Sequence, residues 1–228
     1  MSKFSAPRVV IVDHGLGNLY SVQQACAHVG LQASITADQR EILSADAVIL
    51  PGVGAFGDAM RTLHRLDLVS VLRDLAGSPK PLLGICLGVQ LLMTESFEFG
   101  RHAGLGIIEG QVVSLERPQL DGRTLKVPQI GWNRVCPPAG SPPSSPDLWA
   151  DTPLATVPKG AYMYFVHSYV VQPQDPGVIL STSRYGHIDF CSSLGRGNVF
   201  ACQFHPERSG PHGLTLYRNL ARRLTRPA

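Results

Sequence analysis

The sequence predicts an α/β fold in one domain: an open, mostly parallel sheet flanked by helices, with additional antiparallel strands in the second half. Three observations predict it. In the first half, short apolar runs alternate with helix-like segments, and glycine-containing stretches directly follow several of those runs. From about Gly106 onward strand-like segments dominate, with turn signals at Asp121-Gly122 and at residues 175–177. A chain of 228 residues is long enough to bury one substantial core.

The first half supplies the parallel strands. Residues 8–12 form a β-branched strand, residues 21–29 are predicted as a helix that Gly30 closes, and residues 47–50 form an apolar strand that Pro51 ends. In an open α/β sheet, ligands bind at the carboxyl ends of the strands. The motifs that follow the strands are therefore expected along one edge of the sheet; they are residues 15–17, 51–54 and 84–88.

Residues 84–88, Gly-Ile-Cys-Leu-Gly, follow an apolar run and open a helix-like segment at 89–93. A strand that turns at once into a helix pushes the residue at the turn, Cys86, out of the fold, as in a nucleophile elbow. The helix N-terminus favours a thiolate and offers free N–H groups to an oxyanion. Gly84 and Gly88 leave room for a strained backbone and for a substrate. Cys86 could instead be a core residue, since free cysteine is often buried.

A thiol nucleophile needs a base, and the base needs an orienting group. Residues 199–204 are predicted as a short apolar strand that leads to His205, Pro206 and Glu207. The i, i+2 spacing places both polar side chains on the same side of an extended segment, where a carboxylate can hold the imidazole in one tautomer. The alternative is an exposed turn with two ordinary polar residues.

Residues 84–90 together with residues 203–207 resemble the class I (triad) glutamine amidotransferases. Three more stretches resemble one branch of that family, the glutaminase subunits of imidazole glycerol phosphate synthase; they are residues 13–22, 50–60 and 127–133. The resemblance runs from about residue 8 to the C-terminal helix. It implies the family's single-domain fold over residues 1–228 and a catalytic triad of Cys86, His205 and Glu207. It also implies a glutamyl thioester intermediate, with neither a cofactor nor a metal.

The resemblance implies further roles. Oxyanion stabilisation and glutamine binding are expected from Gly52, Val53, Gly54, Leu87, Gly88, Gln90, Glu98, His167, Ser168 and Tyr169. The partner interface is expected at Asn18, Trp132, Tyr164 and Arg208. Residues 51–54 could be only a strand-ending turn, the aromatics of 164–169 could be simple core, and Trp132 could equally be a core aromatic. The chain departs from the family pattern at His14, Gln129, Val170 and Arg208, which is expected to affect only the subunit interface and signalling across it.

The function that the resemblance implies is a glutaminase that delivers ammonia to a separate cyclase subunit in histidine biosynthesis. The products would be glutamate, imidazole glycerol phosphate and aminoimidazole carboxamide ribotide. One alternative is the glutaminase subunit of anthranilate or aminodeoxychorismate synthase, and another is a catalytically silent regulatory module of the same fold. A third is a cysteine peptidase or stress protein of a related elbow fold.

Composition indicates a cytoplasmic protein. A net charge of +3, from 20 basic and 17 acidic residues, is too small an excess to predict a nucleic-acid partner. The five cysteines contain no Cys-x-x-Cys pair, so neither a disulfide framework nor a zinc site is expected. No signal peptide or long apolar span is found, so no membrane association is expected. Residues 15–18 lack the third glycine of a dinucleotide fingerprint. Residues 1–7 are predicted to be a flexible N-terminus, and the Pro/Ser-rich residues 137–146 a surface loop.

Overall fold

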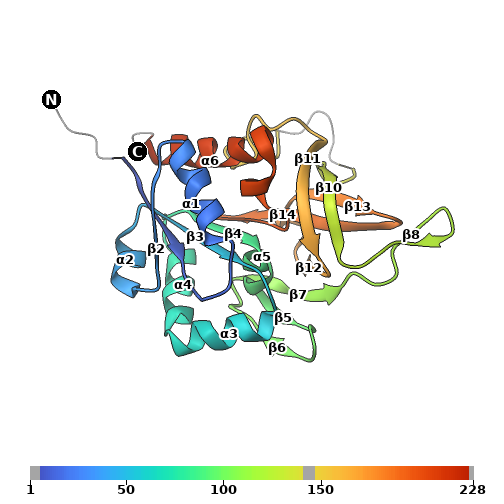
Figure 1. The fold of residues 1–228 in the computed structure, drawn as a ribbon, viewed down its shortest axis with the longest axis horizontal. Helices are drawn as coiled ribbons and strands as arrows, with labels where there is room; N and C mark the ends of the chain where they lie inside the picture. Colours follow the sequence, from blue (N-terminus) through green and yellow to red (C-terminus); the bar gives the residue numbers. More distant parts are fainter. Residues whose placement is uncertain (1–5, 141–146, 226–228) are drawn as a thin grey trace.

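The fold is built on a seven-stranded central sheet, seen in a computed structural model that describes residues 6–140 and 147–225 (Figure 1). The strand order is β13-β14-β15-β4-β3-β1-β2, and the five strands from β2 to β15 are parallel. The two remaining strands are antiparallel, which confirms the predicted sheet. The strands are β1 (Arg8–Val12), β2 (Gln32–Thr36), β3 (Ala47–Gly52), β4 (Leu82–Cys86), β13 (Ile179–Tyr185), β14 (Ile188–Arg196) and β15 (Val199–Cys202).

Helices cover both faces of this sheet (Figure 1). On one face lie α1 (Leu19–His28) and α6 (Gly210–Thr225); on the other lie α2 (Gln39–Ser44), α3 (Phe56–Arg65), α4 (Leu68–Ala76) and the short α5 (Leu87–Leu91). Alternate residues of β1 serve the two layers: Val9 and Ile11 pack with α1 and α6, while Val10 and Val12 pack with α3 and α4. The sheet is therefore buried on both sides, which explains its uninterrupted apolar strands.

Residues 93–173 add three smaller β structures. A four-stranded sheet has the order β12-β7-β5-β6, and the pairs β10-β11 and β8-β9 form two hairpins. The strands are β5 (Met93–Ser96), β6 (His102–Ala103), β7 (Ile108–Ser114), β8 (Gln119–Leu120), β9 (Arg123–Thr124), β10 (Gln129–Val135), β11 (Ala161–His167) and β12 (Tyr169–Pro173). The predicted turn at Asp121-Gly122 joins β8 to β9. The turn at 175–177 leads into a 3-10 turn, η1 (Pro176–Val178), in which Gly177 N donates to the Asp175 carboxylate.

Two predicted boundaries were wrong. Pro51 does not end β3, because β3 pairs with β1 only as far as Ile49 and continues along β4 through Gly52. A proline is tolerated in a strand where no neighbouring strand on one side needs a backbone N–H from that residue. The helix predicted over 89–93 ends at Leu91, because Met93 pairs with β7 as the first residue of β5.

Residues 1–5 of the predicted flexible N-terminus and residues 141–146 of the predicted surface loop lie outside the described residues. Within the described part of the chain, no helix is long and apolar enough to cross a membrane.

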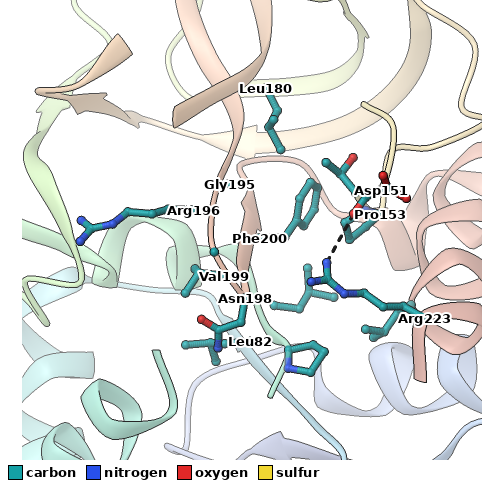
Figure 2. A pocket seen from close by; sticks show the side chains of 15 residues that line it. Leu82, Asp151, Pro153, Leu180, Gly195, Arg196, Asn198, Val199, Phe200 and Arg223 are labelled. Atoms are coloured by element: carbon teal, nitrogen blue, oxygen red, sulfur yellow. Dashed lines mark hydrogen bonds between the residues drawn. The ribbon is translucent and has the colours of Figure 1, made fainter. Parts of the chain in front are cut away.

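A mostly apolar cavity of about 210 Å³ lies at the amino ends of β4 and β15 (Figure 2). Leu82, Leu180 and Phe200 line it, and Arg223 of α6 reaches to its rim, where the guanidinium donates to the Asp151 carbonyl at 3.4 Å. Parallel strands place their carboxyl ends at the other edge of the sheet. This cavity is therefore remote from the elbow at the carboxyl end of β4.

Candidate active site

Cys86 is the last residue of β4 and directly precedes α5, so it lies at the predicted strand-to-helix turn. Its φ of 54° and ψ of −108° are strained for a residue with a side chain, at a cost of about 1–3 kcal/mol. The sequence had predicted an exposed side chain. This prediction was wrong, because Cys86 is only 6% exposed. Its thiol donates to the Val166 carbonyl at 3.7 Å and accepts from Gln203 Nε2 at 3.7 Å. Segments distant in sequence therefore cover the elbow.

The other buried cysteines differ from Cys86 in their surroundings. Burial raises the pKa of Cys26 and of Cys191 to about 12 and that of Cys202 well above its ordinary value. These three thiols remain neutral at pH 7, and all four buried cysteines, Cys86 included, pack within the hydrophobic core clusters. Cys86 instead has the amide of Gln203 beside its sulfur and His205 within interaction range. Its polar neighbours favour the nucleophile over the core-cysteine interpretation.

The two elbow glycines are required by the protein's own packing. A Cβ atom on Gly88 would lie 1.9 Å from the Leu50 carbonyl oxygen of β3, and one on Gly84 would lie 2.9 Å from the Ala201 Cβ of β15. The sequence had predicted room for a substrate. The crowding instead comes from α5 and β4 approaching their neighbouring strands so closely that only glycine fits.

His205 and Glu207 form a buried pair beyond the end of β15. His205 Nδ1 and Glu207 Oε1 are 2.8 Å apart, and both side chains are almost inaccessible to solvent. The sequence had predicted an extended segment here, and this was wrong. His205 instead caps a 3-10 turn, η2 (Pro206–Arg208), because the fixed φ of Pro206 suits a first helical position. The backbone N–H of His205 donates to the Tyr164 carbonyl at 2.9 Å, which anchors the imidazole to β11.

The charge of this pair follows from its surroundings. Burial lowers the pKa of His205, but the interactions with Cys86 and Glu207 outweigh burial and raise the pKa to about 10. The imidazole is therefore protonated at neutral pH. Because the folded-state pKa exceeds the ordinary value of 6.5, this charge stabilises the fold fully below pH 6.5, and the contribution is lost as the pH rises through about 10.

Replacing Glu207 by glutamine is expected to lower the pKa of His205 by about one unit or more, because the neutral amide no longer stabilises the imidazolium. An NMR titration of the His205 ring protons in both proteins measures this shift. The control is Asp189→Asn, which removes an exposed carboxylate paired with Arg184 and should leave the titration unchanged. An unshifted His205 pKa in Glu207→Gln would contradict the charge coupling.

The predicted glutamine-binding residues gather around Tyr169. Gln90 Nε2 donates to the Tyr169 carbonyl at 3.2 Å, and His167 Nδ1 donates to the same oxygen at 3.0 Å. Burial, and then the charge of Glu98, raises the pKa of the Tyr169 hydroxyl, while Glu98 Oε2 accepts from Phe56 N at 2.5 Å. Burial lowers the pKa of His167 to about 4, so its ring is neutral. Ser168 lies between β11 and β12, so the three consecutive residues form the strand break.

The predicted oxyanion segment lies beside the elbow. Gly52 is in register with Cys86, and a Cβ atom on Gly52 would lie 3.0 Å from the Leu87 Cβ at the start of α5. Val53 and Gly54 are exposed beyond the end of β3, and Gly54 has a φ of +96°. The alternative of a simple strand-ending turn is disfavoured, because Gly52 still belongs to β3.

Trp132, Tyr164 and Arg208 form a stack, which we call the aromatic stack; Trp132 and Arg208 are exposed, and Tyr164 is half-buried. The rings of Trp132 and Tyr164 meet edge to face at 6.0 Å, and the Arg208 guanidinium lies 4.6 Å from the centre of the Tyr164 ring. Trp132 is 56% exposed, so the core interpretation of this residue was wrong. Asn18 is the N-cap residue of α1 and makes no ring contact with the stack among the described residues.

Three of the four departures from the family pattern are not at the surface. His14, Gln129 and Val170 are buried within the chain, so any influence of these three residues on the subunit interface must pass through the residues packed around them. The His14 imidazole donates from Nε2 to the Pro51 carbonyl at 2.7 Å and thereby supports the backbone just before the oxyanion segment.

Two residues of the site were missed. Gln203 links the Cys86 sulfur to Gln90, whose Nε2 donates to Gln203 Oε1 at 3.2 Å. Ser209 accepts from Tyr164 N at 2.9 Å and donates to the His205 carbonyl at 2.6 Å, so one hydroxyl joins β11 to the base. A polar Gln203 within an otherwise apolar strand end was a usable signal in the sequence. Ser209 gave none, because serine after a turn is common.

Known proteins resemble the chain along nearly its whole length. The sequence profile of the family described as glutamine amidotransferase class-I matches residues 10–224. Imidazole glycerol phosphate synthase subunit HisH of Rhodopirellula baltica is 45% identical over 93% of this chain and 96% of that protein. The subunit of the same name from Aquifex aeolicus is 44% identical over 95% and 97%. The structure of PurLQS from Thermotoga maritima superposes with a TM-score of 0.72 at 17% identity, covering 97% of this chain and 100% of that chain, and supports the fold alone.

Proposed function

Since this chain belongs to the class I glutamine amidotransferase family, we propose that it is the glutaminase subunit of an imidazole glycerol phosphate synthase. It hydrolyses glutamine to glutamate and delivers ammonia to a separate cyclase subunit. Relatives that carry this name at 44–45% identity support this branch over anthranilate or aminodeoxychorismate synthase. The arrangement of Cys86, His205 and Glu207 carries the proposal, because a silent regulatory module has no need of a buried nucleophile, base and orienting carboxylate.

In the proposed reaction, the Cys86 thiolate attacks the side-chain amide carbon of glutamine. The carbonyl oxygen becomes an oxyanion, which accepts hydrogen bonds from the backbone N–H groups of Val53 and Leu87. His205, protonated beside the sulfur, gives its proton to the leaving nitrogen, and ammonia departs as the C–N bond breaks. The neutral imidazole then takes a proton from water, whose oxygen attacks the glutamyl thioester and releases glutamate and the thiolate. Glu207 stabilises the imidazolium in both steps.

The glutamine itself is proposed to lie against the Tyr169 cluster. Glu98 supplies a carboxylate for the α-ammonium group, and the backbone of residues 167–169 supplies polar groups at the strand break. Gln90 holds the Tyr169 carbonyl and Gln203 together, which supports a role in shaping this wall. Cys86 contacts the Val166 carbonyl from the same strand, so the substrate wall and the nucleophile are directly connected.

The aromatic stack is proposed as part of the cyclase interface, together with Asn18. Its position supports this proposal. Tyr164 of the stack accepts a hydrogen bond from the backbone N–H of His205, so a partner that contacts Tyr164 touches a residue bonded directly to the base. Exposed apolar side chains on the same face of the β10-β11 hairpin, Ile130 and Tyr162, enlarge the surface. Large exposed apolar surfaces of this kind are typical of subunit contacts.

The chain alone is expected to be nearly idle and to be activated about 10²–10³-fold by the cyclase with its substrate bound, because one misdirected oxyanion donor costs about that factor. The peptide N–H of Val53, between two glycines, is the donor expected to turn. Glutamate release is measured for the chain alone, with cyclase, and with cyclase plus substrate. Trp132→Ala should weaken the activation, whereas Tyr20→Ala, another exposed aromatic, should not. Full activity of the chain alone would contradict the switch.

A further inference from the structure

The Glu207 carboxylate can accept more hydrogen bonds than the one it shares with His205. Oε1 is 2.8 Å from His205 Nδ1, whereas Oε2, which is buried, has no hydrogen-bond partner among the described residues. The side chain is only 1% exposed. A buried carboxylate without enough donors is costly, and buried polar atoms almost always find partners. Glu207 Oε2 therefore requires a hydrogen-bond donor.

Tyr217 of α6 presents the complementary atom. Its side chain is fully buried, and within the described chain its hydroxyl has no hydrogen-bond partner either. Helix α6 approaches the Pro206–Arg208 turn so closely that a Cβ atom on Gly213 would lie 2.0 Å from the Pro206 carbonyl oxygen. Tyr217 follows Gly213 by four residues and thus lies on the same face of the helix, towards the turn that carries Glu207.

Electrostatics agree with this placement. Burial, followed by the negative charge of Glu207, raises the pKa of the Tyr217 hydroxyl well above its ordinary value, so it remains a proton donor. The other titratable groups that face it are Cys26 of α1 and Cys202 of β15. Both are neutral thiols with raised pKa values, and Cys202 already donates to the Phe204 carbonyl at 3.4 Å. Thiols are weak donors, so the phenol is the strong donor in this region.

We propose that the Tyr217 hydroxyl donates a hydrogen bond to one buried water that in turn donates to Oε2 of Glu207, and that Tyr217 is thereby a positioning residue for the base. This inference rests on the proposed function, because it assigns Tyr217 a role behind the Cys86-His205-Glu207 triad. By stabilising the ionised carboxylate, the hydroxyl fixes the orientation of Glu207 and through it the tautomer and the charge of His205. Tyr217 does not touch the substrate.

Tyr217→Phe tests the proposal, since it removes only the hydroxyl. We expect kcat/KM to fall about tenfold, the effect of losing one hydrogen bond to a charged group, with KM nearly unchanged. The acid limb of the pH profile should move to higher pH, because the ionised carboxylate then lacks a donor that stabilises its charge. In the Glu207→Gln background the same substitution should have almost no further effect.

Leu220→Ala is the control, because it opens a cavity in the same helix without removing a polar group. It should lower stability and leave the pH profile in place. An unchanged acid limb in Tyr217→Phe, or a full additional loss in the Glu207→Gln background, would overturn the proposal. Two readouts need no catalysis: Tyr217→Phe should lower both the urea midpoint and the His205 pKa measured by NMR. A wild-type chain that hydrolyses no glutamine even with its partner would contradict the proposed function, while these readouts still decide the role of Tyr217.

Discussion

Cys86→Ala is expected to remove glutamine-dependent synthesis by the complex by about 10⁴-fold or more, while synthesis from added ammonium salts continues at the wild-type rate. The loss is this large because the covalent step has no other nucleophile, and removing one member of a catalytic unit costs nearly as much as removing all of them. Ammonia supplied from solution bypasses the step. Imidazole glycerol phosphate formation is measured with glutamine and with ammonium as nitrogen donors.

Cys136→Ala is the matched control, because Cys136 is a half-buried cysteine on the isolated bridge to Thr182, away from the elbow. It should retain both activities. Equal loss of both activities in Cys86→Ala, with the fold intact by circular dichroism, would show that Cys86 supports the complex as a whole and not ammonia production.

Gly88→Ala is expected to destabilise the protein by about 3 kcal/mol or more, because the added methyl group cannot fit 1.9 Å from the Leu50 carbonyl oxygen. Either α5 or β3 must move, and both carry residues of the proposed oxyanion site. Any protein that folds should therefore also lose glutamine hydrolysis. Urea unfolding and the glutaminase assay measure the two effects.

Gly77→Ala provides the comparison for this second prediction. Gly77 has a right-handed φ of −86°, and a Cβ atom there would make only an ordinary contact, 3.6 Å from the Asp74 carbonyl oxygen. Stability should change by less than about 1 kcal/mol. If Gly88→Ala were as stable and as active as Gly77→Ala, the close packing of α5 on β3 would not matter for the site.

Features of the fold that depend on local sequence were predictable. The strand at residues 8–12 and the elbow around Cys86 follow from apolar runs and from the small residues that interrupt them. Features that depend on a distant neighbour were not predictable. Pro51 continues β3 because β1 stops short of it, which no local pattern reveals. Cys86 is buried because the Val166 carbonyl, 80 residues further along the chain, covers it.

The candidate site shows the same division. The proximity of His205 to Glu207 follows from adjacency in the sequence, whereas the contact of Gln203 with Cys86 depends on β15 lying beside β4. The resemblance to a family indicated the further site residues. For Trp132, the sequence left a core and an interface position equally favoured, and its exposure in the structure excludes the core position. Tyr217 had no signal at all, because an aromatic residue on a C-terminal helix normally belongs to the core.

The pairing of β4 with β15 makes completion of the active site a late event in folding. Gln203 and Cys86 are separated by 117 residues, yet β15 occupies the centre of the sheet, between β4 and β14. Contacts between such distant segments form slowly, because the intervening chain must first be ordered. If β1 to β4 were paired without β15, the chain would have the elbow cysteine in place but neither His205 nor Glu207 beside it. The competence to hydrolyse glutamine therefore requires closure of the central sheet, because only the β4-β15 pairing brings the three triad residues together.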